Sequence, residues 1–150
     1  MPQSLSKIYV HIIFSTKNRE NLINQEIENE LFSYVATILK ALNCPAIKIN
    51  GTRNHIHILC VLSKNISLYK VVEDIKKKSS KWIKTKGNGY SFFSWQNGYG
   101  AFSVSQSKVK MVLDYILKQK EHHKSVDFKA ELLKFLKKYD LDFDEKYLWD

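Results

Sequence analysis

The chain has 150 residues, of which 44% are hydrophobic and 26% are charged, a length that suits one packed domain and is too short for two. This composition, with 8 Tyr, 8 Phe and 3 Trp, excludes a disordered or collagen-like chain, and the presence of only two cysteines excludes a disulfide scaffold. The formal net charge of +9 favours a polyanionic partner, usually a nucleic acid.

Strands and helices are predicted to alternate in a single domain spanning residues 1–150. Segments rich in β-branched and aromatic residues favour strands, and apolar side chains that recur every three or four residues favour helices. In chain order, the predicted elements are a strand at 7–15, a helix at 27–42, strands at 46–50 and 55–62, a helix at 68–82, a strand or hairpin within 92–105, a helix from Ser107 and a helix capped by Ser125.

The order β-α-β-β-α-β is typical of a split βαβ arrangement. We therefore predict an α/β (α+β) fold with a ferredoxin-like antiparallel sheet of four strands. Helices cover one face of such a sheet, and the other face is expected to be open for a site or a partner. Extra C-terminal helices follow, and the first of them carries Tyr115.

Two histidines on one predicted strand are candidate metal ligands. Side chains alternate across a strand, so His55 and His57 share one face, whereas Cys60 points with the apolar residues into the core. Two imidazoles on one face can hold a metal ion, and they can equally face solvent or form hydrogen bonds. The strand alone leaves both interpretations open.

Tyr115 and Gln119 are four residues apart on the third predicted helix, which places them on the same side of it. Both flank the apolar stripe of that helix. A tyrosine in such a place is usually an aromatic residue at the edge of the core, and a nucleophile is the rarer alternative.

A basic helix and an aromatic segment are candidate contacts to a nucleic acid. Lysines crowd the second predicted helix, and aromatic and glycine residues alternate in 95–102. The ordinary interpretations are a solvated helix face and a hairpin with a core tryptophan; the functional ones are phosphate contacts and base stacking. The candidate residues are Lys76, Lys77, Lys78, Lys81, Trp95, Gln96 and Tyr99.

Nothing in the sequence predicts a membrane protein. No apolar run approaches the ~20 residues that span a bilayer. The N-terminal segment lacks the basic-then-apolar order of a signal peptide, so we expect a cytoplasmic protein.

Several of these motifs together resemble one known family. His55-Ile56-His57 resembles the His-hydrophobe-His motif of HUH nucleases, and residues 115–119 resemble the Tyr-x-x-x-Gln motif of single-tyrosine transposases of the insertion-sequence 200/605 family. Residues 95–105, 118–124 and 144–149 are also similar to that family, so the resemblance runs through nearly the whole chain. One departure is Asn54, where relatives often carry Asp.

This resemblance implies a DNA transposase of a mobile element. Such proteins are homodimers with composite active sites, in which the tyrosine helix of one subunit meets the histidines of the other. They cut single-stranded DNA near hairpins and rejoin it through a 5′-phosphotyrosine, without ATP. Tyr115 is the implied nucleophile, and His55, His57 and Gln119 are the implied ligands of Mg²⁺ or Mn²⁺, an ion that polarises the phosphate for a tyrosine whose unperturbed pKa is about 10.

Two other hypotheses use the same scaffold. One is a domesticated relative that processes dispersed palindromic repeats, or a relaxase-like nicking protein. The other is a non-catalytic module that binds single-stranded nucleic acid on its sheet, although the Lys/Arg-Gly-Phe-type motif of such modules is missing from the sequence.

Overall fold

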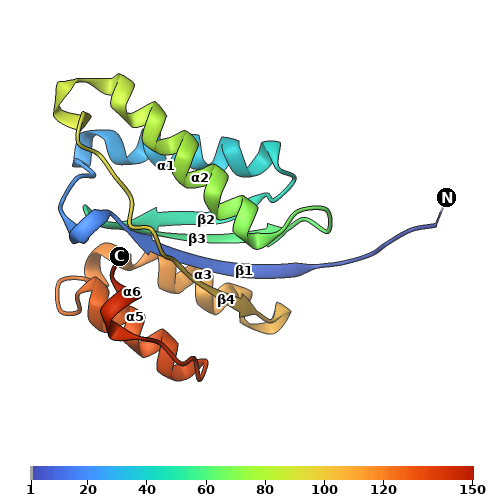
Figure 1. Ribbon diagram of the computed structural model, residues 1–150. Helices are drawn as coiled ribbons and strands as arrows, with labels where there is room; N and C mark the ends of the chain where they lie inside the picture. Colours follow the sequence, from blue (N-terminus) through green and yellow to red (C-terminus); the bar gives the residue numbers. More distant parts are fainter. Residues whose placement is uncertain (1) are drawn as a thin grey trace.

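An antiparallel four-stranded sheet forms the centre of the computed structural model, which describes residues 2–150 (Figure 1). The strand order is β2-β3-β1-β4, and each neighbouring pair is antiparallel. This is the order that a split βαβ unit produces, so the predicted ferredoxin-like sheet is confirmed. The strands are β1 (Ile8–Ser15), β2 (Ala46–Gly51), β3 (His55–Leu62) and β4 (Gly100–Val104).

Helices cover both faces of the sheet (Figure 1). The long helices α1 (Gln25–Ala41) and α2 (Leu68–Ile83) lie side by side on one face. The helices of the C-terminal part lie on the other face, which we had expected to be open. These are α3 (Val109–Leu117), α4 (Gln119–His122), α5 (Phe128–Lys138) and α6 (Glu145–Leu148). Within residues 2–150, no helix is long and apolar enough to cross a bilayer.

The alternation of side chains along β3 separates the core from the opposite face. Ile56, Ile58 and Cys60 pack into the main core beneath α1 and α2, as predicted. Burial raises the pKa of the Cys60 thiol to about 12, so it is an unreactive core group. His55 and His57 therefore point toward the C-terminal helices.

The helix that begins after Ser107 is shorter than predicted. It ends at Leu117, and Gln119 starts a separate short helix, α4. The side chain of Asn50 in β2 explains the break, because its Nδ2 donates hydrogen bonds to the carbonyl oxygens of Ile116 (2.9 Å) and Leu117 (3.3 Å). A continuing helix would need those carbonyls for its own amides.

One further local prediction was wrong. Asp127, not Ser125, caps α5, because its carboxylate accepts a hydrogen bond from the amide of Ala130 (2.9 Å) while the Ser125 hydroxyl donates to the carbonyl of His122. The predicted strand or hairpin within 92–105 is a strand, β4, and before it Trp95 forms an isolated bridge with Thr16.

Trp95 is a core residue, which corrects our expectation that it contacts a nucleic acid. Only 6% of it is exposed. Its ring meets the rings of Phe14 and Phe93 edge to face at 4.9 and 4.8 Å, and its Nε1 donates a hydrogen bond to Ser79 Oγ (3.0 Å). A base cannot stack on a ring that is enclosed in this way.

Lys76 and Gln96 also serve the protein itself. Lys76 Nζ donates hydrogen bonds to the carbonyls of Gln96 (2.8 Å) and Gly98 (2.6 Å), and burial lowers its pKa to about 8. Gln96 is buried, and its Oε1 accepts a hydrogen bond from the amide of Ser15 (2.8 Å). Both residues fix the segment that leads into β4. Among the candidate contacts, Lys77, Lys78, Lys81 and Tyr99 are exposed.

We expect the replacement Trp95→Ala to lower the free energy of unfolding by about 3–5 kcal/mol, because it leaves a large cavity in the core. Urea unfolding of this variant and of Tyr99→Ala measures the difference. Tyr99 is 38% exposed, so its replacement should cost at most about 1 kcal/mol. If Trp95→Ala kept wild-type stability, the assignment of Trp95 to the core would be wrong.

Candidate active site

The turn between β2 and β3 brings His55 to the edge of the site. Gly51 makes this turn possible, since a Cβ at this position would collide with the carbonyl oxygen of His55. The amide of Thr52 donates to that same carbonyl at 3.0 Å. Although they face away from the main core, both His55 and His57 are fully buried.

Each of these histidines is oriented by a partner on its Nδ1 atom. His55 Nδ1 lies 2.8 Å from Asn54 Oδ1 and 2.9 Å from Thr52 Oγ1, while His57 Nδ1 lies 2.7 Å from Nε2 of His11 in β1. An oxygen partner on Nδ1 favours the tautomer that leaves Nε2 free as a ligand atom. Asn54, the departure from the family motif, therefore orients His55.

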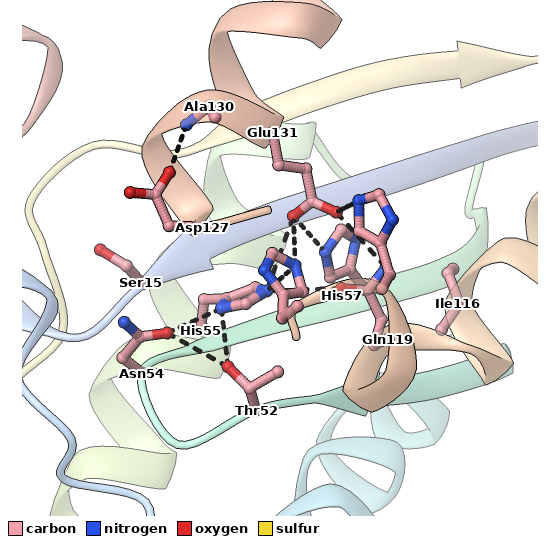
Figure 2. A network of polar contacts seen from close by, with 12 residues as sticks. Ser15, Thr52, Asn54, His55, His57, Ile116, Gln119, Asp127, Ala130 and Glu131 are labelled. Carbon is pink, nitrogen blue, oxygen red and sulfur yellow. Dashed lines mark hydrogen bonds and ion pairs between the residues drawn. The ribbon is translucent and has the colours of Figure 1, made fainter. Parts of the chain in front are cut away.

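A buried carboxylate joins the histidines to the tyrosine. Glu131 of α5 is 1% exposed, and its Oε1 lies 2.9 Å from His57 Nε2 and 3.1 Å from His123 Nε2 (Figure 2). Its Oε2 accepts hydrogen bonds from the hydroxyl of Tyr115 and from Gln119 Nε2 (3.4 Å). The two oxygens of one carboxylate thus face different groups.

The four residues that the sequence motifs singled out meet in one place. Tyr115 reaches the Glu131 carboxylate from α3, and its hydroxyl is also 3.3 Å from His122 Nε2. Gln119 is fully buried at the start of α4, with its Oε1 3.4 Å from His55 Nε2. All of these groups lie close together within one chain.

The donor atoms of this cluster fit a divalent metal ion. The candidate ligand atoms of His55, His57, His123 and Glu131 all lie within 4.8 Å of one another. Burial, followed by the neighbouring His57 and His123, lowers the pKa of His55 well below its usual value, so this ring keeps a free lone pair at neutral pH. Three imidazole nitrogens and one carboxylate oxygen suit a transition ion better than Mg²⁺, which prefers oxygen ligands.

The protonation states of the carboxylate and the tyrosine differ. Burial alone would raise the pKa of Glu131, but hydrogen bonds with His123 and His57 lower it far below its usual value. Burial and the adjacent Glu131 carboxylate raise the pKa of the Tyr115 hydroxyl. The site therefore contains a neutral phenol, which donates a hydrogen bond to an ionised carboxylate.

Glu131, His123 and His11 were not predicted to belong to the site. Glu131 had one sequence feature that would have indicated it, because it lies on the apolar side of α5 between Phe128 and Leu132, where a charged residue needs a buried partner. In the sequence, His123 belongs only to the segment 118–124, which resembles the family. The spacing along one chain gave no indication that these residues meet β3.

The exposed lysines are not part of this cluster. Lys77, Lys78 and Lys81 lie on α2, and α2 covers the face of the sheet opposite to the histidines (Figure 1). Any role of these lysines is therefore separate from the chemistry of the histidine cluster.

Comparison with known proteins gives a family match. The family model described as "Transposase IS200 like" matches residues 4–119. A search of the curated proteins found no match. A solved structure of a protein assigned as a transposase from Deinococcus radiodurans R1 has 18% identity and a TM-score of 0.62, over 79% of this chain and 98% of that one. A REP-associated tyrosine transposase bound to a REP hairpin has 13% identity and a TM-score of 0.59, over 84% of this chain and 74% of that one. Both share the fold.

We expect the chelator-treated protein to lose stability as the pH falls from 7.5 to 5.0. Burial, followed by the neighbouring His57, lowers the pKa of His11 to about 3, so below pH 6.5 the unfolded chain binds a proton that the folded chain does not. At pH 5.0 the protonation of His11 in the unfolded chain should lower the free energy of unfolding by about 2 kcal/mol. Urea unfolding of wild type and His11→Gln at both pH values measures it.

The His11→Gln variant should show a smaller loss, because glutamine does not titrate. His122→Gln removes a more exposed imidazole whose pKa burial also lowers, so it should reduce the loss less than His11→Gln does. Equal losses in His11→Gln and wild type would show that His11 does not carry this dependence.

Proposed function

The chain belongs to the IS200-like transposase family, and from this premise we propose that it cuts and rejoins single-stranded DNA through a covalent bond to Tyr115. One observation carries the proposal: the Tyr115 hydroxyl, the histidine pair and Gln119 converge on the buried Glu131 carboxylate. We further infer that residues 1–150 act as one catalytic domain.

The tyrosine hydroxyl already has a proton acceptor. Its hydrogen bond to Glu131 Oε2 makes this oxygen the acceptor of the phenolic proton during attack. The phenolic oxygen then bonds to phosphorus, the bond from phosphorus to the 3′-oxygen breaks, and the 3′-oxygen takes a proton from water. One DNA strand remains joined to Tyr115 through its 5′-phosphate.

Rejoining is the reverse of this step. The 3′-hydroxyl of a second strand gives its proton to solvent and bonds to phosphorus, the bond from phosphorus to the phenolic oxygen breaks, and the phenolic oxygen takes its proton back from Glu131. Because the ester to Tyr115 replaces one phosphodiester with another of similar energy, the reaction needs no ATP.

In this proposal, a divalent ion is held by His55, His57 and Gln119, with Glu131 Oε1 and His123 Nε2 close enough to join them. When bound, the ion draws charge from the phosphate and stabilises the departing 3′-oxygen. The imidazole-rich ligand set favours Mn²⁺ over Mg²⁺.

The proposed substrate is single-stranded DNA that carries a hairpin. The net charge of +9 suits such a polyanion, and one protein of similar fold is bound to a REP hairpin. The exposed Lys77, Lys78 and Lys81 would contact its phosphates and Tyr99 a base. A homodimer stays a prediction, although each chain holds a complete set of site residues.

We expect Tyr115→Phe to abolish a covalent protein–DNA adduct, because the attacking oxygen is removed, while DNA binding changes little. Labelled single-stranded DNA from both flanks of the gene is incubated with protein and Mn²⁺ and run on a denaturing gel. Wild type should give a shifted band that a chelator removes. An adduct that persists in Tyr115→Phe would exclude Tyr115 as the nucleophile.

A mixture of two inactive variants tests whether one chain holds the working site. If Tyr115 acts on the histidine cluster of its own chain, Tyr115→Phe mixed with His57→Ala contains no complete site and stays inactive. Recovery of adduct in the mixture would instead indicate a composite site shared by two subunits.

We expect wild type to bind Mn²⁺ and His57→Ala to bind it more than about 100-fold more weakly. Loss of a residue that only orients a metal ligand usually weakens binding by at most about 100-fold. Calorimetric titration measures the affinity without depending on activity. Glu131→Gln should weaken it by about 10- to 100-fold and Gln119→Ala by about tenfold. The matched control is Glu121→Gln, at an exposed carboxylate of α4. Wild-type affinity in Glu131→Gln would exclude Glu131 as a ligand.

A further inference from the structure

A cavity of about 270 Å³ opens directly beside Tyr115, between α3 and α5. Its apolar wall consists of Met111, Val112 and Phe135, and Lys134 and Lys138 of α5 also line it. Glu131, which holds the Tyr115 hydroxyl, lies at its inner end. None of the sequence motifs includes this part of α5.

We propose that this cavity binds the first nucleotide on the 3′ side of the cleaved bond, the one whose 5′-phosphate becomes joined to Tyr115. The inference rests on the proposed function and adds to it the place and the chemistry of one substrate nucleotide. After cleavage, only this nucleotide is attached to the tyrosine oxygen, so its sugar and base must occupy space next to Tyr115.

The size and the wall of the cavity suit a single base. Its volume is slightly below the about 300–1,000 Å³ typical of pockets for drug-sized ligands, so it accommodates one nucleotide rather than several. Phe135 is half-buried and fixed at right angles to Tyr115 (5.9 Å between ring centroids, 82°) and to His11 (5.2 Å, 80°). Phe102 already stacks on one face of the Phe135 ring (5.1 Å between centroids, 20°), so the other face of the ring is the stacking surface left for a base.

The charge at the cavity suits the phosphates that follow. Lys134 and Lys138 are one turn apart on α5 and both are exposed. Across residues 2–150, neither ammonium group forms an ion pair. Lys138 Nζ lies 6.0 Å from the centroid of the Tyr139 ring. Two adjacent cations without a carboxylate partner favour the backbone of a strand that continues from the cavity.

A second cavity explains why the cavity beside Tyr115 should bind the nucleotide that carries the 5′-phosphate, and not the nucleotide that carries the leaving 3′-oxygen. This cavity, of about 420 Å³, borders His123, Asn54 and Thr52, and it shares no lining residue with the cavity at Tyr115. Contacts run from Tyr115 through Glu131 and His123 to His55 and Asn54, so the two cavities border opposite ends of the cluster. In an in-line displacement the leaving oxygen lies opposite the nucleophile. The 3′ end therefore leaves toward the polar cavity, and the 5′ nucleotide stays at Tyr115.

The first test couples a change in the DNA to a change in the protein. Once the cleavage position in wild type is mapped, two abasic DNA substrates are made. The first has its abasic residue at the first nucleotide on the 3′ side of the cleaved bond, and the second, a control, has it five nucleotides further in the 3′ direction. In wild type the first abasic substrate should form adduct about tenfold more slowly, because base stacking is lost. In Phe135→Leu, which keeps apolar volume but not the ring, this penalty should fall to about twofold. Phe92→Leu, at an exposed aromatic, should keep the tenfold penalty.

The second test uses charge. The double variant Lys134→Glu/Lys138→Glu should form adduct about tenfold more slowly. A plot of the logarithm of its DNA-binding constant against the logarithm of salt concentration should be shallower by about 1.4, the value for two lost phosphate contacts on a single strand. Lys110→Glu/Lys137→Glu carries the same change of net charge on α3 and α5 and should remain close to wild type. Thermal melting of each variant confirms folding.

The outcomes separate this inference from the function on which it rests. The nucleotide site is overturned if the abasic substrate slows adduct formation equally in wild type and Phe135→Leu, or if the two charge variants form adduct at equal rates. In either case, adduct formed by wild type still supports the proposed function. Absence of any wild-type adduct with these DNA strands overturns the proposed function and the nucleotide site together.

Discussion

A buried negative charge connects the two halves of this molecule. Glu131 is almost completely removed from solvent, and a carboxylate in that environment is tolerated only with partners that offset the loss of hydration. Its partners come from β3, α3 and the end of α4, so the charge fixes α5 against the sheet and against the tyrosine helix at once. An apolar residue at this position would pack as well, yet it would leave His57, His123 and Tyr115 without a common partner.

The sheet makes this arrangement possible because its two faces have different chemistry. Along β3, one set of alternate side chains closes the apolar core beneath α1 and α2, and the other set supplies the two histidines. The tight turn at Gly51 and the side chains of Asn54 and Thr52 then set the direction of the His55 ring. The main core and the two histidines thereby lie on opposite faces of one strand. The C-terminal helices cover the histidine face, where Leu59 packs against Ile116 in a smaller apolar cluster.

The sequence indicated local periodicity well and distant contacts poorly. The shared face of His55 and His57 and the closeness of Tyr115 to Gln119 follow from repeats of two and four residues. The strand order follows from the β-α-β-β-α-β order of the elements, and the structure has all three features. The break in the helix after Leu117 depends on Asn50, which is 66 residues away from Ile116 in the chain. Trp95 looked equally suited to a core and to a base-stacking surface, and only the packing of Phe14 and Phe93 around it decides between them.

The position of the carboxylate also explains how one cluster can serve two chemical steps. Glu131 Oε1 faces the imidazoles that would share a metal ion, while Oε2 faces the phenol. A positive ion near Oε1 lowers the basicity of the whole carboxylate, so proton transfer from Tyr115 becomes less favourable as the phosphate becomes more reactive. In the proposed reaction these effects oppose each other. Tyr115 is partly buried but lines an open cavity, through which a substrate would reach the phenol, whereas Glu131 is almost completely buried. In the proposed reaction, the buried carboxylate accepts the phenolic proton and the cavity gives the substrate access to Tyr115. Helix α5 contributes to both, because it supplies Glu131 on its buried side and lines the cavity with Lys134 and Lys138.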